Sequence, residues 1–196
     1  MSLKLSNDRY EEIKKAVVDL FEACSICCTP ISGYEIAVNL GIKVIPYSAL
    51  LPSKRQIAIR TCPDGFSGFD DGEWRICVND DDQIPYGRIN FTILHEIAHI
   101  VLNHTEDSEL ADTEADFFAK FAQCPPVLIH TLGLRDVGEI MNRFDTSYGA
   151  ACFAMTYYQK WLRYGGAFYK DYELRTCRLF GIDVKKGDCR RQSVQI

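Results

Sequence analysis

Two histidines and a glutamate lie close together in an apolar segment, in the stretch ILHEIAHIVLNH at residues 93–104. Four polar residues interrupt the apolar run from 91 to 102: Thr92, His95, Glu96 and His99. Their spacing of i, i+3, i+4 and i+7 predicts one polar stripe along a helix whose other faces are buried. Such a stripe is typical of a helix that forms the wall of a functional site.

The spacing of His95 and His99 suits a single metal ion. The two residues are one helical turn apart, so both imidazoles can reach one ion at roughly 2.0–2.1 Å, and zinc is the metal that this ligand type favours. Glu96 follows the first histidine and would lie beside the ion, where it can take a proton from water. The stretch HEIAH therefore matches the HExxH pattern of zinc peptidases. Two ordinary core histidines are the alternative, but burying these groups without a metal would cost several kcal/mol.

Glu114 is the predicted third ligand. It lies within the apolar stripe of the next helical segment, ELADTEADFFAKFA at 109–122, whereas Asp112 and Asp116 lie off that stripe. A carboxylate on the buried face of a helix needs a partner, and a zinc ion held by the preceding helix would supply one. A His-His-Glu site with one open position is the arrangement of a hydrolytic zinc enzyme.

The remaining histidines are not predicted to bind metal. His104 is five residues after His99, roughly 140° further around the helix, and we expect it to end that helix. His130 is isolated in LIHTLG and, like His104, is expected to be a structural residue and not a ligand. The sequence does not identify the residue that would stabilise an oxyanion; the candidates are Tyr148, Tyr86 and His104.

The elements that must position these residues form an α+β pattern. Strands are predicted at 42–47, 56–62, 65–69 and 73–79, with a hairpin turn at 70–72. Helices are predicted at 6–28, 32–41, 91–104, 108–123, 126–132, 136–144 and 147–164. The tail from Lys170 is expected to be a strand or irregular. The prediction is a small, mainly antiparallel sheet packed against zinc-binding helices, zincin-like, followed by a helical C-terminal region.

Composition restricts the class of protein. With 196 residues, 47% of them hydrophobic, and a net charge of -5, the chain is typical of a globular protein and not of a general nucleic-acid binder. The N-terminal residues lack a secretory pattern and no apolar run is long enough to span a bilayer, so a cytoplasmic location is expected. The nine cysteines, including CSICC at 24–28, are then expected to be free thiols.

Two blocks, INFTILHEIAHIVLNH and TEADFFAKFAQCPP, resemble the ImmA/IrrE family of metallopeptidases. Members of that family pair an FTxxHExxH helix with an EANxFAxxLLMP-like helix. The resemblance implies a gluzincin-like zinc endopeptidase that cleaves a helix-turn-helix repressor in mobile-element or stress-response regulation. It implies His95, His99 and Glu114 as zinc ligands and Glu96 as the general base. QCPP in place of LLMP, and Asp116 where Asn is frequent, depart from the pattern.

The resemblance also bears on domain organisation. Residues 1–125 would form the metallopeptidase core, and residues 126–196 a helical region packed on it. The stretch 136–161 is similar to a helix-turn-helix piece, but its second helix has no Arg or Lys before Lys160, so packing or partner docking is expected in place of DNA reading. The strand at 73–79 is predicted to be the edge that holds an extended substrate.

Two other functions stay open. The chain could be a regulatory module that holds a repressor or antitoxin without cutting it, although the intact Glu96 speaks against a pure binder. It could also be a DNA-binding regulator that uses residues 136–161, which the negative net charge disfavours.

Overall fold

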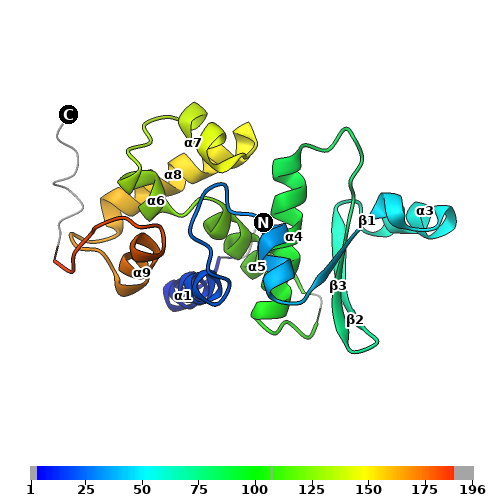
Figure 1. Cartoon of the computed structure of the whole chain (residues 1–196). Helices are drawn as coiled ribbons and strands as arrows, with labels where there is room; N and C mark the ends of the chain where they lie inside the picture. The colour runs from blue at the N-terminus through cyan, green and yellow to red at the C-terminus, as the bar shows by residue number, and fades with distance from the viewer. Residues whose placement is uncertain (1–3, 107, 188–196) are drawn as a thin grey trace. The chain divides into compact units, whose positions relative to one another are not determined.

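A computed structural model describes residues 4–106 and 108–187 (Figure 1). The chain divides into two compact units: the first includes residues 32–119 and the N-terminal residues up to Ser6, and the second includes residues 7–31 and those from 120 onward. The predicted α+β class with a helical C-terminal region is confirmed.

The first unit contains a small mixed sheet. Its strands are β1 (Lys43–Pro46), β2 (Gly65–Asp70) and β3 (Glu73–Val78), in the order β1-β3-β2. β3 pairs antiparallel with β2 and parallel with β1. The predicted hairpin turn is confirmed, because Asp71 and Gly72 between the two antiparallel strands have φ values of 52° and 80°, as a type I′ turn requires.

Two strand predictions were wrong. The stretch 73–79 is not an edge, because β3 lies between β1 and β2. The two edge strands are therefore β1 and β2. The stretch 56–62 is not a strand, because α3 (Pro52–Thr61) occupies it after the short 3-10 helix η1 (Tyr47–Ala49). Pro52 at the first helical position starts α3, and the alternating Ile57 and Ile59 that suggested a strand are both exposed.

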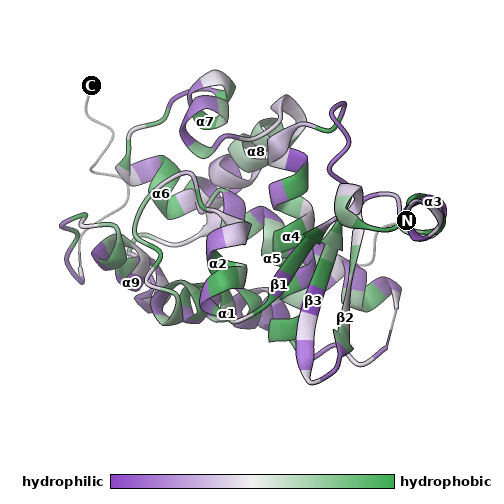
Figure 2. Ribbon diagram, turned by 45° about the vertical axis from the view of Figure 1, so that its right-hand side comes forward, coloured by the Kyte–Doolittle hydropathy of each residue, from purple (hydrophilic) through white to green (hydrophobic). Residues whose placement is uncertain are grey.

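Helix α4 (Tyr86–Val101) carries the predicted polar stripe and is held between the sheet and helix α2 (Gly33–Asn39). The Gly33 amide donates a hydrogen bond to Asn90 Oδ1 over 2.6 Å. The apolar side of α4 is fully buried through Ile93, Leu94, Ile97 and Ala98. Figure 2 shows α4 with hydrophobic and hydrophilic residues on the same helix. Because its apolar side faces the core, the histidines occupy a partly exposed side.

The second unit is helical. It contains α1 (Asn7–Ala23), α6 (Pro126–Thr131), α7 (Val137–Phe144), α8 (Tyr148–Tyr164) and α9 (Asp171–Leu179), and α5 (Glu109–Gln123) contributes its last residues from Lys120. α1 packs on α9, where Arg175 Nη2 lies 2.6 Å from Asp19 Oδ1 and also pairs with Glu22.

The tail was predicted incorrectly, because residues 171–179 form α9 and not a strand or irregular segment. The buried side of α9 includes Glu173 and Thr176, so the apolar periodicity that marks a helix is weak there. The Glu173 carboxylate is satisfied by the Lys170 amide at 2.7 Å and by the Trp161 indole N–H.

Helices α7 and α8 confirm the predicted helices at 136–144 and 147–164, with Asp136 and Ser147 as N-caps. His130 is buried, and its Nδ1 lies 2.9 Å from the Tyr158 hydroxyl. None of the helices within residues 4–106 and 108–187 is long and apolar enough to cross a membrane.

Candidate metal centre

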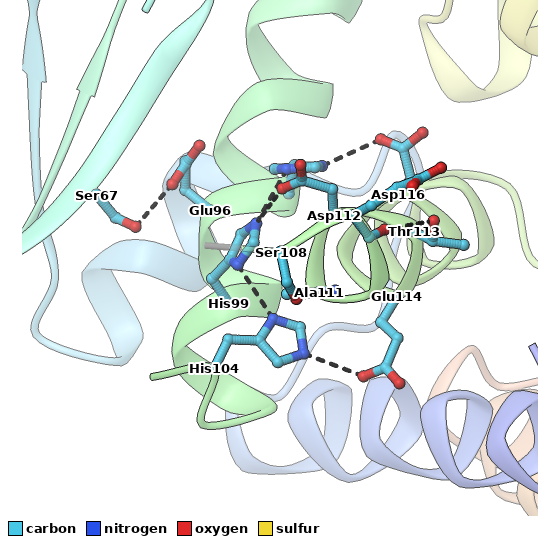
Figure 3. A network of polar contacts seen from close by, with 12 residues as sticks. Ser67, Glu96, His99, His104, Ser108, Ala111, Asp112, Thr113, Glu114 and Asp116 are labelled. Atoms are coloured by element: carbon cyan, nitrogen blue, oxygen red, sulfur yellow. Dashed lines mark hydrogen bonds and ion pairs between the residues drawn. The ribbon is translucent and has the colours of Figure 1, made fainter. Parts of the chain in front are cut away.

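The two histidines of α4 point their Nε2 atoms at each other. The His95 and His99 Nε2 atoms are 3.1 Å apart, and the Asp112 Oδ1 of α5 lies 3.6 Å from His99 Nε2 (Figure 3). One potential ligand atom from each of these three residues lies within 4.8 Å of the others. Within residues 4–106 and 108–187, this is the group of His, Cys, Asp and Glu side chains that could hold a metal ion.

The other ring nitrogens have partners that define their protonation. His95 Nδ1 lies 3.2 Å from Asp116 Oδ1 and therefore carries the proton that a carboxylate accepts. On the other histidine, His99 Nδ1 lies 3.0 Å from His104 Nδ1. His104 Nε2 lies 3.0 Å from Glu114 Oε2, so His104 donates to Glu114 from Nε2 and accepts from His99 at Nδ1 (Figure 3).

This assignment leaves a lone pair on both Nε2 atoms. Two lone pairs 3.1 Å apart, with the Asp112 carboxylate beside them, repel each other unless a cation lies between them. Tetrahedral ligands at 2.0–2.1 Å from a metal ion are about 3.3 Å apart, close to the spacings observed. Histidine ligands commonly donate their second nitrogen to a carboxylate or another acceptor, as both do here. The donor set therefore fits a divalent metal.

Glu114 lies one imidazole away from this group. Its side chain is only 8% exposed, and its Oε2 lies 3.0 Å from His104 Nε2. The partner of the Glu114 carboxylate on the buried face of α5 is thus His104. From the sequence, His104 was expected only to end the preceding helix. The structure brings His95 and His99 together as predicted and puts Asp112 beside them.

The sequence contains a signal for Asp112 that we had not used. Asp112 and Asp116 have the same i, i+4 spacing as His95 and His99, and each aspartate meets one histidine. The aspartate side chains are 68% and 44% exposed, because the histidines face a partly open side of α4 and not the core. The half-exposed face of α5 thus offers Asp112 as a further candidate ligand beside the predicted Glu114.

Glu96 points toward the sheet. Its Oε2 accepts a hydrogen bond from the Ser67 hydroxyl of β2 over 2.7 Å. Burial raises the pKa of Glu96 above its ordinary value, against the lowering effects of the Ser67 hydrogen bond and of His95. Ser67 thus fixes one carboxylate oxygen, and the residue is placed between the edge strand and the histidines.

The cysteines lie outside this group. Those that the structure describes, up to Cys177, are free thiols, and the exposed Cys27 and Cys28 join no metal-binding cluster among the described residues. Cys124 is buried, which raises the pKa of its thiol to about 12. The expectation of free thiols is confirmed for these positions, and Cys189 lies outside the described residues.

A known family model matches the part of the chain that carries the candidate metal centre. Residues 62–156 match the model of the IrrE N-terminal-like domain of the M78 peptidases, a range that includes β2, β3, α4 and α5. No curated protein matches the chain. The matched residues contain His95, Glu96, His99 and Asp112. The match confirms the resemblance to the ImmA/IrrE family for this part of the chain, which is similar to the IrrE N-terminal-like domain of the M78 peptidases.

Proposed function

We propose that the chain is a zinc-dependent endopeptidase with His95, His99 and Asp112 as metal ligands and Glu96 as the general base. The observation that carries the proposal is the convergence of two histidine Nε2 atoms and a carboxylate beside Glu96. Two His ligands and one carboxylate leave a fourth position open, which is the arrangement of catalytic zinc and not of structural zinc.

Each residue of the site would then have a separate role in peptide hydrolysis. When bound, zinc supplies a Lewis acid that polarises the peptide carbonyl and lowers the pKa of water. Glu96 takes the proton from the attacking water at one carboxylate oxygen, while Ser67 holds the other oxygen. Glu96 then passes this proton to the leaving amine. Asp116 and the His104–Glu114 pair keep the two histidine ligands in the tautomers that leave Nε2 unprotonated.

An extended peptide would bind along the outer edge of β2. In the described residues β2 pairs only with β3, so its other edge has no strand partner and can accept an added strand. Ser67 belongs to this strand and contacts Glu96, which would put a peptide added there beside the general base. This assignment replaces the substrate strand that we had predicted at 73–79.

The proposed substrate is a helix-turn-helix repressor in the cytoplasm, as the family resemblance implies. A DNA-binding protein is basic, and acidic residues surround the site on α5 and in the segment 64–82. Direct DNA binding by residues 136–161 is not part of the proposal. The first turn of α8, which would enter a groove, begins Tyr148-Gly149-Ala150 and carries no cation.

A binding module that holds a repressor without cutting it is the second candidate, since it could keep the same metal group. The buried carboxylate of Glu96, fixed by Ser67, favours hydrolysis because a pure binder needs no base there. The two candidates differ in one outcome, the loss of repressor cleavage in Glu96→Gln with metal binding intact.

The first test is metal analysis of the purified chain beside His99→Ala, Asp112→Ala and, as a control, Glu109→Ala on the exposed face of α5. We expect one zinc per chain in the wild type and in Glu109→Ala, and loss of zinc in the other two variants. Zinc-loaded wild type and Glu96→Gln are then incubated with candidate repressors, and the products are identified by mass spectrometry. A chain that takes up no metal would refute the peptidase proposal. Cleavage that is equal in Glu96→Gln would refute the role of the base.

A further inference from the structure

An apolar hollow of about 290 Å³ lies in the first unit, between α3 and the edge strand β2. Its walls include Leu50, Lys54, Ile57 and Ala58 from α3 and the loop before it, and Phe66 from β2. Phe66 and Ile57 are 37% and 54% exposed, so the hollow is open to solvent. We call it the Phe66 pocket.

The Phe66 pocket and the metal group lie on opposite faces of β2. Successive side chains of a strand alternate, and Ser67 points to the face where it contacts Glu96 of α4. Gly65, two residues earlier, packs against Thr92 of α4 on the same face. Phe66 lies between them in sequence and points to the face of α3 and η1, where its ring is 6.2 Å from that of Tyr47.

A peptide added to the outer edge of β2 would follow the same alternation. Side chains directly opposite each other in paired strands lie on the same face, with Cβ atoms about 4.5–5.5 Å apart. A peptide residue opposite Ser67 would then face Glu96. Its neighbour, opposite Phe66, would face the pocket.

We propose that the Phe66 pocket binds one apolar side chain of the peptide substrate, at the position adjacent to the residue that faces Glu96. The inference rests on the proposed function and names the substrate class: an extended segment with an aliphatic or aromatic residue beside the cleavage site.

The charges around the pocket restrict the choice further. Lys54 lines it, and α3 also carries Arg55 and Arg60 but no acidic residue. A substrate lysine or arginine at this position would bring a second cation against Lys54 in an apolar environment, so the pocket disfavours basic side chains. The preference at this position is therefore the opposite of the general attraction of the acidic site for a basic protein.

The test uses the zinc-loaded full chain with Glu96→Gln, which keeps bound peptides intact, and a library of random linear peptides. Bound peptides are sequenced. We expect one position enriched roughly tenfold in Leu, Ile, Met or Phe and depleted in Lys and Arg. Two matched pairs of further substitutions identify the pocket. Ile57→Ser removes a wall residue, whereas Ile59→Ser changes an exposed residue of the same helix outside the pocket. Lys54→Glu inverts the charge of a residue that lines the pocket. Arg60→Glu inverts the charge of a residue of the same helix that does not line it.

The expected result is loss of the apolar enrichment in Ile57→Ser and acceptance of Lys and Arg in Lys54→Glu, with Ile59→Ser and Arg60→Glu unchanged. Equal enrichment in Ile57→Ser and Ile59→Ser, or no apolar position at all, overturns the pocket assignment. Failure of the peptidase proposal has a different signature, because zinc content and the dependence of cleavage on Glu96 are measured without reference to α3.

Discussion

At the scale of single residues, the pair of Glu114 and His104 lies directly behind the proposed ligand His99. The two side chains are 8% and 11% exposed and lie 3.0 Å apart. Their interaction orients His104, which accepts from His99 and so keeps the proton of His99 away from Nε2. A residue behind a ligand in this way typically changes metal affinity by 10–100-fold when it is altered.

Glu114→Gln tests this arrangement, because it removes the charge and keeps the shape. We expect metal affinity, measured by competition with a chelator, to fall about tenfold. Asp112→Ala removes a proposed ligand and should cost more than about 100-fold, and Glu109→Gln should change nothing. If Glu114→Gln abolishes metal binding while Asp112→Ala retains it, Glu114 is the third ligand and Asp112 is not.

At the scale of elements, the packing of α4 on the sheet determines where Glu96 lies. The contact is close at Gly65, where an added Cβ would meet the Thr92 side chain at 2.6 Å and the Cys77 carbonyl oxygen at 2.8 Å. Ser67, which holds Glu96, is two residues away on the same strand. The absence of a side chain at residue 65 therefore allows β2 to approach α4 closely enough for the Ser67 hydrogen bond.

Gly65→Ala should lower the free energy of unfolding by about 1–3 kcal/mol through overpacking. Gly68 provides a matched control on the same strand, because an added Cβ there meets no atom within 4 Å. Chemical denaturation of both variants measures the difference. Equal stability of the two variants would show that α4 and β2 can separate at little cost.

The contact between α1 and α9 should depend on pH. The hydrogen bond from Arg175 lowers the pKa of Glu22 below its ordinary value of 4.5, although burial opposes this. A lowered carboxyl pKa stabilises the folded state above that ordinary value, and the stabilisation disappears as the pH falls through the folded-state pKa.

Arg175→Met should therefore cost about 1 kcal/mol at neutral pH, since the pair is partly exposed. The variant and the wild type should approach each other in stability as the pH falls below 4.5. Thermal melts over a pH series, with Arg143→Met on the exposed side of α7 as control, check this. A stability difference that is constant with pH would mean that Arg175 acts by packing alone.

At the scale of the whole molecule, the proposed metal ligands all belong to one compact unit. His95, His99 and Asp112 lie within residues 32–119, whereas α6, α7, α8 and α9 form the second unit with α1. A ligand that binds the folded state stabilises it by about 2.7 kcal/mol at a concentration 100 times its dissociation constant. This stabilisation should be greatest in the unit that contains the ligands.

Hydrogen exchange with and without zinc measures this distribution. We expect the amides of α4 to exchange up to about 100-fold more slowly with zinc, and those of α8 to change little. His99→Ala should show no protection by zinc. Equal protection of α8 would show that both units unfold as one.

The elements were predictable from the sequence where the signal is local. Capping residues such as Ser32, Asp136 and Ser147 and the Asp71-Gly72 turn act over a few residues, so the helices and the hairpin that they begin or connect are found at the expected places. The sequence patterns gave wrong predictions for α3 and α9. In α3, two exposed isoleucines alternate with other residues as in a strand. In α9, polar residues are buried, so the apolar periodicity of a helix is weak.

The sequence by itself determined the HExxH stripe, the α+β class and the family, because residue type and helical spacing bring His95, Glu96 and His99 to one face. The tertiary structure brings Asp112 beside the histidines and leaves one edge of β2 without a strand partner among the described residues. These depend on how α5 faces α4 and on the order β1-β3-β2, which residues far apart in the chain establish. Burial and the family resemblance predict Glu114 as a ligand, whereas in the structure Asp112 lies 3.6 Å from His99 and Glu114 lies 3.0 Å from His104.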